Sequence, residues 1–132
     1  MNHSTVLVVE DNEMNQKLIM RQLQHLGTTD IAVVGNGVEA LAWLERNTCR
    51  LILADCHMPL MDGYTMTRRI RLRESSQGAT RLPVIAYSAG VTEEEKATCR
   101  AAGMDGHIPK PVPMAVLQAT LLQWLGKPDR EH

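Results

Sequence analysis

Carboxylates stand directly after two short apolar runs of this sequence. Glu10 and Asp11 follow the run 5–9, and Asp55 follows the run 51–54. Short apolar runs bounded by turn residues are typical of buried strands. In open parallel sheets, ligands bind beyond the carboxyl ends of the strands. Asp55 is therefore the first candidate for chemistry, and Glu10 and Asp11 are candidates beside it.

Three carboxylates in one pocket repel one another, so they need a cation. Their ligand atoms are oxygens, without paired His or Cys, which indicates a hard ion such as Mg²⁺. Ser88 and Lys110 follow the last two expected strands and add a hydroxyl and an ammonium group. A metal, an ammonium and a hydroxyl around one carboxylate suit an incoming phosphoryl group, because they neutralise or hydrogen-bond its oxygens. Asp55 would then be the nucleophile and would form an aspartyl phosphate.

Alternating strands and helices are expected to position these residues. The apolar runs predict strands at 5–9, 31–34, 51–55, 82–87 and 105–108, and helical spacing predicts helices at about 14–26, 38–46, 64–73, 93–103 and 113–125. Such alternation is typical of a doubly wound α/β domain with right-handed crossovers. The polar segment 74–80 is predicted to be a loop, and the arginines of the third helix are predicted to form a solvated face.

Size and composition exclude several classes of protein. The 132 residues predict one domain over 1–132, with its core at about 5–125. A net charge of −1 without a concentrated basic stretch argues against direct nucleic-acid binding. The apolar runs are too short to span a bilayer, and the N-terminus lacks the regions of a signal peptide. Three cysteines without CxxC spacing suit reduced thiols, so we expect a cytoplasmic domain.

Five motifs, in order along the chain and at the ends of expected strands, resemble the receiver domain of two-component response regulators. The resemblance covers about residues 5–125 and implies a flavodoxin-like (βα)5 fold with five parallel strands in the order 2-1-3-4-5. The motifs are Val9-Glu10-Asp11-Asn12, then Asp55 with Met58-Pro59 and Met61-Asp62-Gly63, then Ala86-Tyr87-Ser88-Ala89, then Gly103-Met104-Asp105, and finally Lys110-Pro111.

The resemblance also implies a role for each candidate residue. Asp55 would accept a phosphoryl group from a phosphohistidine, and Lys110 would pair first with Asp55 and later with the phosphoryl group. Ser88 would be the switch hydroxyl, and the peptide bond before Pro111 would be cis. The ligands implied for Mg²⁺ are Glu10, Asp11, Asp55 and the backbone carbonyl of His57, with Asp11 the more direct ligand of the acid pair.

Two histidines depart from the commonest pattern of that family. The family usually has Tyr or Phe three residues before the lysine, where the ring swings inward on phosphorylation, and here that residue is His107. A histidine ring could still swing, although its charge could change near neutral pH. An exposed strand histidine without a switching role is the alternative. His57 stands where family side chains tune the loss of the phosphoryl group, and the alternative is a solvated loop residue.

The resemblance predicts a phosphorelay module that catalyses its own phosphorylation, so it is a switch and not a metabolic enzyme. An aspartate-nucleophile phosphatase or phosphotransferase is an alternative, but it generally needs a second acid where this chain has His57. A receiver that only docks partners is another alternative. Such a receiver would be expected to lose the acid pair, the acceptor or the lysine, and this sequence retains all of them.

The run 10–16 resembles receivers found within hybrid sensor histidine kinases, which favours an excised domain of such a kinase over a free-standing regulator. Whether the parent chain is itself an enzyme stays open. The implied partners are a histidine kinase domain, a histidine phosphotransfer domain, or both. They are expected to dock on the first helix around Asn15, Gln16 and Ile19, and the domain itself is expected to be a monomer.

Overall fold

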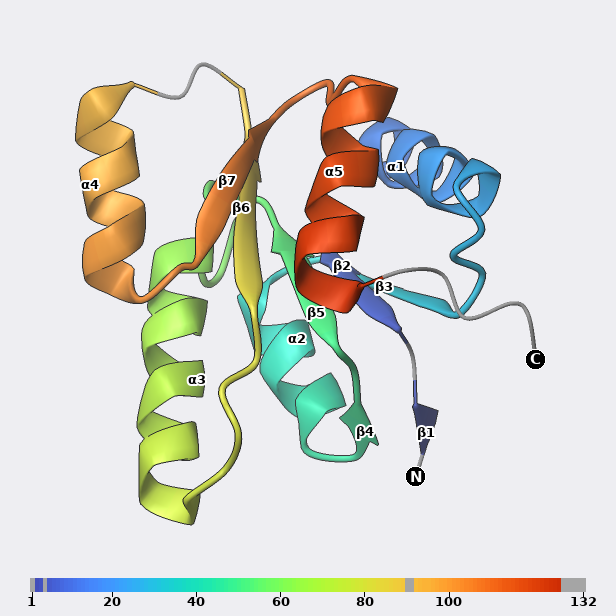
Figure 1. Cartoon of the computed structure of the whole chain (residues 1–132). Helices are drawn as coiled ribbons and strands as arrows, with labels where there is room; N and C mark the ends of the chain where they lie inside the picture. Colours follow the sequence, from blue (N-terminus) through green and yellow to red (C-terminus); the bar gives the residue numbers. More distant parts are fainter. Residues whose placement is uncertain (1, 4, 90–91, 127–132) are drawn as a thin grey trace.

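One parallel sheet forms the centre of the molecule. The computed structural model describes residues 2–3, 5–89 and 92–126. The sheet has the order β3-β2-β5-β6-β7, which is the predicted order 2-1-3-4-5 when its own strands are counted (Figure 1). The strands are β2 (Val6–Val9), β3 (Ile31–Val34), β5 (Leu51–Ala54), β6 (Val84–Ser88) and β7 (Gly106–Pro109). The predicted α/β fold class is confirmed.

A second, two-stranded sheet was not predicted. Strand β1 (Asn2–His3) pairs in parallel with β4 (Asn47–Thr48), which lies in the connection between the second helix and β5. Both strands have two residues, which is too short for apolar alternation to show in the sequence.

Helices cover both faces of the central sheet, with α1 and α5 on one face and α2, α3 and α4 on the other (Figure 1). In the described part of the chain, no helix combines the length and apolar character that crossing a bilayer requires. The helices are α1 (Glu13–His25), α2 (Gly37–Leu44), α3 (Gly63–Gln77), α4 (Glu93–Ala102) and α5 (Met114–Leu125).

The strands β2 and β5 are apolar along their whole length, as expected for central strands with both faces covered. Successive side chains of a strand point to opposite faces, so Val6 and Val8 join the cluster under α1 and α5. Leu7 and Val9 join the cluster under α2 and α3. All four side chains are completely buried. This packing fixes the register of β2 and so fixes where its carboxyl end lies.

Side-chain caps fix where several of the helices begin. The side chain of Asn12 accepts a hydrogen bond from the Asn15 N–H at 2.9 Å. Asp62 and Thr92 cap α3 and α4 in the same way. Each cap satisfies an N–H group that the first helical turn leaves without a partner. Asn12 and Asp62 thereby position the segments that follow the strand ends.

The third helix is longer than the sequence predicted. It continues through residues 74–77, which were expected to be a loop, and ends at Gly78 in the left-handed conformation with φ of 63°. Glu74 accounts for the difference, because its carboxylate binds Arg71 at 3.0 Å and accepts a hydrogen bond from the Leu82 N–H at 2.7 Å. Tertiary contacts hold this polar turn helical, which its composition alone does not indicate.

Arg71 is not part of a solvated face, so that prediction was wrong for this arginine. Its side chain is 15% exposed and binds Asp105 at 2.8 Å. It also donates to the carbonyl oxygens of Gly103 at 2.9 Å and Leu82 at 2.8 Å. Arg71 therefore joins α3 to the connection between α4 and β7.

We expect Arg71→Met to lower the free energy of unfolding by about 2–4 kcal/mol, because the change leaves the Glu74 carboxylate without its cation partner and leaves Asp105 with only the more exposed Arg81. The matched change Arg69→Met, on the exposed side of the same helix, should cost under about 0.5 kcal/mol. Urea unfolding of both variants measures the difference. Equal stability of the two variants would contradict a buried, structural role for Arg71.

Candidate active site

The carboxyl ends of two central strands bring the predicted carboxylates together. Glu10 and Asp11 follow β2, and Asp55 follows the neighbouring strand β5. Hydrogen bonds continue the ladder one residue beyond the strands, since the Asp55 N–H donates to the Val9 carbonyl at 2.9 Å. Ligand oxygens of Glu10, Asp11 and Asp55 lie within 4.8 Å of one another. The acid pair and the predicted acceptor thus form one cluster.

Lys110 lies between the two buried carboxylates. Its Nζ is 2.9 Å from Asp55 Oδ2 and 2.7 Å from Glu10 Oε1. Glu10 is completely buried and Asp55 is 6% exposed, so each charge needs this partner. Burial by itself would lower the pKa of Lys110, but hydrogen bonds to Glu10 and Asp55 outweigh it and raise that pKa above its ordinary 10.5. The ammonium is therefore charged at neutral pH.

Backbone N–H groups hold the other oxygen of each buried carboxylate. The Asn12 N–H donates to Glu10 Oε2 at 3.0 Å, and the His57 N–H donates to Asp55 Oδ1 at 3.0 Å. Asp11, in contrast, is exposed. An all-oxygen donor set of two fixed carboxylates and one accessible carboxylate fits a hard divalent cation such as Mg²⁺.

The strand register places Ser88 at the same end of the sheet. Ser88 ends β6, is 4% exposed and lies opposite Pro109, the residue before Lys110. The peptide bond between Lys110 and Pro111 is cis, as expected. His107 lies on β7, opposite Ala86, and is exposed. Lys110 therefore contacts the acidic cluster, Ser88 lies at the same end of the sheet, and His107 is exposed on the edge strand.

His57 makes a contact that the sequence did not indicate. Its Nε2 lies 3.3 Å from Glu95 Oε2 in the first turn of α4, and its ring meets the ring of Tyr64 edge-on, with 6.0 Å between the centroids. The side chain of His57 is nevertheless 67% exposed. Glu95 is remote in sequence, so no local pattern could link it to the loop after Asp55.

Cys56, next to Asp55 in sequence, points into the core. It is 1% exposed and packs in the cluster under α2 and α3. Burial raises the pKa of its thiol to about 12. A thiol that stays protonated is a poor nucleophile, so Cys56 is not a candidate nucleophile at neutral pH.

The docking surface predicted on α1 was wrong at one residue. Ile19 is completely buried in the core beneath α1, so no partner can contact it. Asn15 and Gln16 are partly exposed, although Gln16 Nε2 donates to the Glu10 carbonyl at 2.6 Å. The apolar side chains that α1 does expose are Met14 (80% exposed) and Leu18 (41%).

Similarity to known proteins agrees with this geometry. The sequence model of the response regulator receiver domain matches residues 6–122. The chain is 42% identical over 121 residues to the hybrid signal transduction protein dokA of Dictyostelium discoideum, covering 91% of this chain and 7% of that protein. It is 40% identical over 116 residues to the sensor histidine kinase RcsC of Salmonella typhimurium, covering 88% of this chain and 12% of that kinase. The chain therefore spans only a small part of these relatives.

A solved structure shows the same likeness in three dimensions. The receiver domain of sensor histidine kinase PA1611 from Pseudomonas aeruginosa, with a magnesium ion coordinated in its active-site cleft, superposes with a TM-score of 0.81. It is 37% identical, and the match covers 95% of this chain and 99% of that chain. The motifs at the strand ends, the fold and these matches together lead to one conclusion. This chain belongs to the response regulator receiver domain family of two-component signalling.

Proposed function

We propose that Asp55 accepts a phosphoryl group from a phosphohistidine, with Mg²⁺ bound beside it. The observation that carries this proposal is the environment of the Asp55 carboxylate. Lys110 Nζ holds one of its oxygens at 2.9 Å, the His57 N–H holds the other at 3.0 Å, and Glu10 and Asp11 lie within ligand distance. This arrangement orients a nucleophile and places positive charge where phosphoryl oxygens would lie.

In the proposed transfer, an Asp55 oxygen forms a bond to phosphorus while the phosphorus–nitrogen bond of the phosphohistidine breaks. The electron pair of that bond leaves with the imidazole. Lys110 neutralises one phosphoryl oxygen, and the Ser88 hydroxyl donates a hydrogen bond to another. Bound Mg²⁺ would supply further positive charge to these oxygens. The proposed protein ligands for the metal are Glu10, Asp11, Asp55 and the backbone carbonyl of His57.

Incubation with acetyl phosphate and Mg²⁺ should add about 80 Da, the mass of one phosphoryl group, to the intact wild type. Asp55→Asn should show no gain, because an amide is a far weaker nucleophile. Intact mass spectrometry measures both proteins, and a chelator provides the metal-free control. An equal gain in the variant would place the acceptor elsewhere. A wild type that gains nothing, even from a phosphorylated histidine kinase, would favour a receiver that only docks partners.

His57 is expected to prolong the life of the phosphoryl group, because it belongs to the loop after Asp55 and its ring contacts Glu95 in the first turn of α4. We expect His57→Ala to shorten the phosphoryl lifetime about threefold, since water reaches the group more easily. Glu95→Gln, which keeps the ring but weakens its contact, should have a smaller effect. The decay of phosphoprotein mass with time measures all three proteins. An unchanged lifetime in His57→Ala would make His57 a solvated loop residue.

We further propose that the domain works within a cytoplasmic phosphorelay as the receiver of a hybrid sensor histidine kinase. Its likeness to parts of a hybrid signal transduction protein and of a sensor histidine kinase supports the proposal. The phosphoryl group would pass from a kinase histidine to Asp55 and then to a histidine phosphotransfer domain. The exposed apolar side chains that we propose as partner contacts are Met14 and Leu18 on α1 and Leu60 in the loop before α3, which is 84% exposed. We expect a monomer that contacts no nucleic acid directly and does not insert into a membrane.

His107 stays a proposed switch residue. Its exposed position on the edge strand β7, three residues before Lys110, supports an outward resting state. An inward movement after phosphorylation would change the surface formed by α4, β7 and α5.

A further inference from the structure

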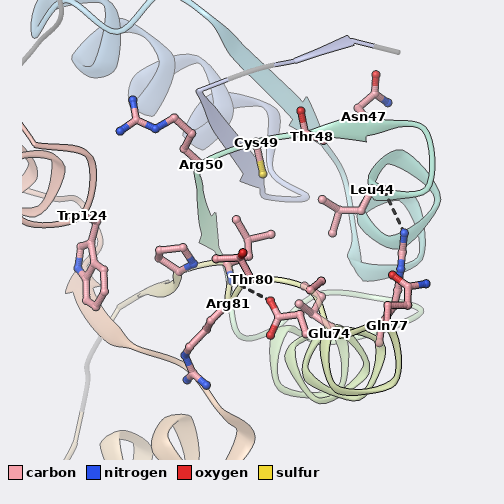
Figure 2. A pocket seen from close by; sticks show the side chains of 15 residues that line it. Leu44, Asn47, Thr48, Cys49, Arg50, Glu74, Gln77, Thr80, Arg81 and Trp124 are labelled. Atoms are coloured by element: carbon pink, nitrogen blue, oxygen red, sulfur yellow. Dashed lines mark hydrogen bonds between the residues drawn. The ribbon is translucent and has the colours of Figure 1, made fainter.

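A second candidate site lies at the opposite end of the sheet from Asp55. A cavity of about 530 Å³ opens beside Arg50 and Pro83, which directly precede β5 and β6. In Figure 2, Arg50, Arg81 and Trp124 line one side of it, and Leu44 and Gln77 line the other. The volume is in the range of small-molecule sites, which is about 300–1,000 Å³.

Positively charged side chains outnumber negatively charged ones around this cavity. Arg71, which does not line the cavity, and Arg81, which does, pair with Glu74 and Asp105. Two other lining arginines bind only backbone carbonyl oxygens. Arg50 Nη2 donates to Leu125 at 2.9 Å, and Arg73 Nη2 donates to Leu44 at 3.1 Å. Within the described residues, neither of these two has a carboxylate partner, so the cavity has two guanidinium charges that are not neutralised.

The remaining walls are largely apolar and include Leu44, Ile70, Leu82, Pro83 and the indole of Trp124. Burial raises the pKa of the lining Cys49 thiol to about 11, so this group is neutral at pH 7 and adds no negative charge. A ligand that fills this space must cover apolar surface and meet positive charge.

We propose that this cavity binds a small organic anion with an apolar body. The anionic group would bind the free donors of Arg50 or Arg73, and the apolar body would pack against Trp124 and the aliphatic walls. Charge-assisted hydrogen bonds to a guanidinium and burial of apolar surface are the two interactions that such a ligand needs. Because Asp55 lies at the other end of β5, binding here leaves the phosphorylation site accessible.

The test uses two probes of the same shape, 1-naphthaleneacetate and its neutral amide, titrated into ¹⁵N-labelled protein. The acetate should shift the amide signals of the lining residues and the indole N–H signal of Trp124, and the neutral probe should bind about tenfold more weakly. Arg50→Gln and Arg73→Gln should each weaken binding of the acetate, whereas Arg69→Gln, an exposed arginine outside the cavity, should not. Thr80→Trp, which fills the cavity from its rim, should abolish binding while both arginines remain.

Three results would overturn the proposal. Equal binding of the two probes would show that charge plays no part. Shifts centred on Glu10, Asp55 and Lys110 would place the anion at the other end of the sheet. Unchanged binding in Thr80→Trp would show that the cavity is not the site. Phosphorylation by acetyl phosphate with and without the acetate probe is the independent check, and it should be unaffected.

Discussion

Gly63→Ala is expected to lower the free energy of unfolding by about 3 kcal/mol, because the added methyl group has no space. A Cβ on Gly63 would lie 2.5 Å from the Asp55 carbonyl oxygen and 3.1 Å from Cys56 Cα. Both are backbone atoms at the end of β5, so neither can move like a flexible side chain. The Gly63 N–H also donates to the Cys56 carbonyl at 3.1 Å, which holds α3 against that strand end.

Gly63→Ala should change both the urea unfolding curve and the rate of phosphorylation. Any shift of the strand end moves the Asp55 carboxylate, so the rate of phosphorylation should fall along with the stability. Gly78→Ala is the matched control, because Gly78 caps the other end of α3 and a Cβ there meets nothing within 4 Å. Its left-handed conformation should cost only about 1 kcal/mol. Equal losses in the two variants would contradict the steric account.

Lys110→Met is expected to cost about 3–5 kcal/mol in the absence of divalent ions, because it leaves two buried carboxylates without a cation. Glu10 is completely buried and Asp55 nearly so, and neither has another side-chain cation within the described chain. Adding Mg²⁺ should restore part of the loss, since an ion that binds the folded state stabilises it. Combining Glu10→Gln with Lys110→Met should recover stability as well. The control Lys96→Met removes an exposed pair with Glu93 and should change little.

The stability difference between wild type and Lys110→Met should depend on pH, because the folded state raises the pKa of Lys110. A group with a higher pKa in the folded state stabilises the fold fully below its unfolded pKa, which is near 10.5. That contribution is lost as the pH rises through the still higher folded value. The stability difference between wild type and Lys110→Met should therefore stay constant between about pH 7 and 9 and shrink only in stronger alkali. A decline that begins near neutral pH would contradict the predicted ion pair.

The sequence predicted the ends of the strands well, because an apolar run reveals where a two-sided buried strand stops. That pattern located Glu10, Asp11, Asp55 and Lys110 at one edge of the sheet. It could not show that Lys110 also binds Glu10. The choice between two neighbouring carboxylates depends on the path of the lysine side chain, and no spacing in the chain encodes that path.

Contacts between remote residues account for most of what sequence reasoning missed. The contact between His57 and Glu95 depends on how α4 lies against the loop after β5. The buried position of Arg71 and the extra turn of α3 depend on Asp105 and Leu82, which arrive from other elements. Ile19 was misplaced for a different reason. The docking surface was inferred from the likeness to a family, whereas Ile19 lies on the face of α1 that packs in the core.

The ion pairs of Lys110 connect residues from distant parts of the chain. They join the ends of β2 and β5 to the segment after β7, so the proposed acceptor site draws on both halves of the chain. A cut in the exposed turn after Gly78 would separate Glu10 and Asp55 from their ammonium partner. Neither fragment would contain a complete acceptor site. Phosphorylation of a mixture of the two fragments would then report their reassembly, and the domain could serve as a split reporter of proximity.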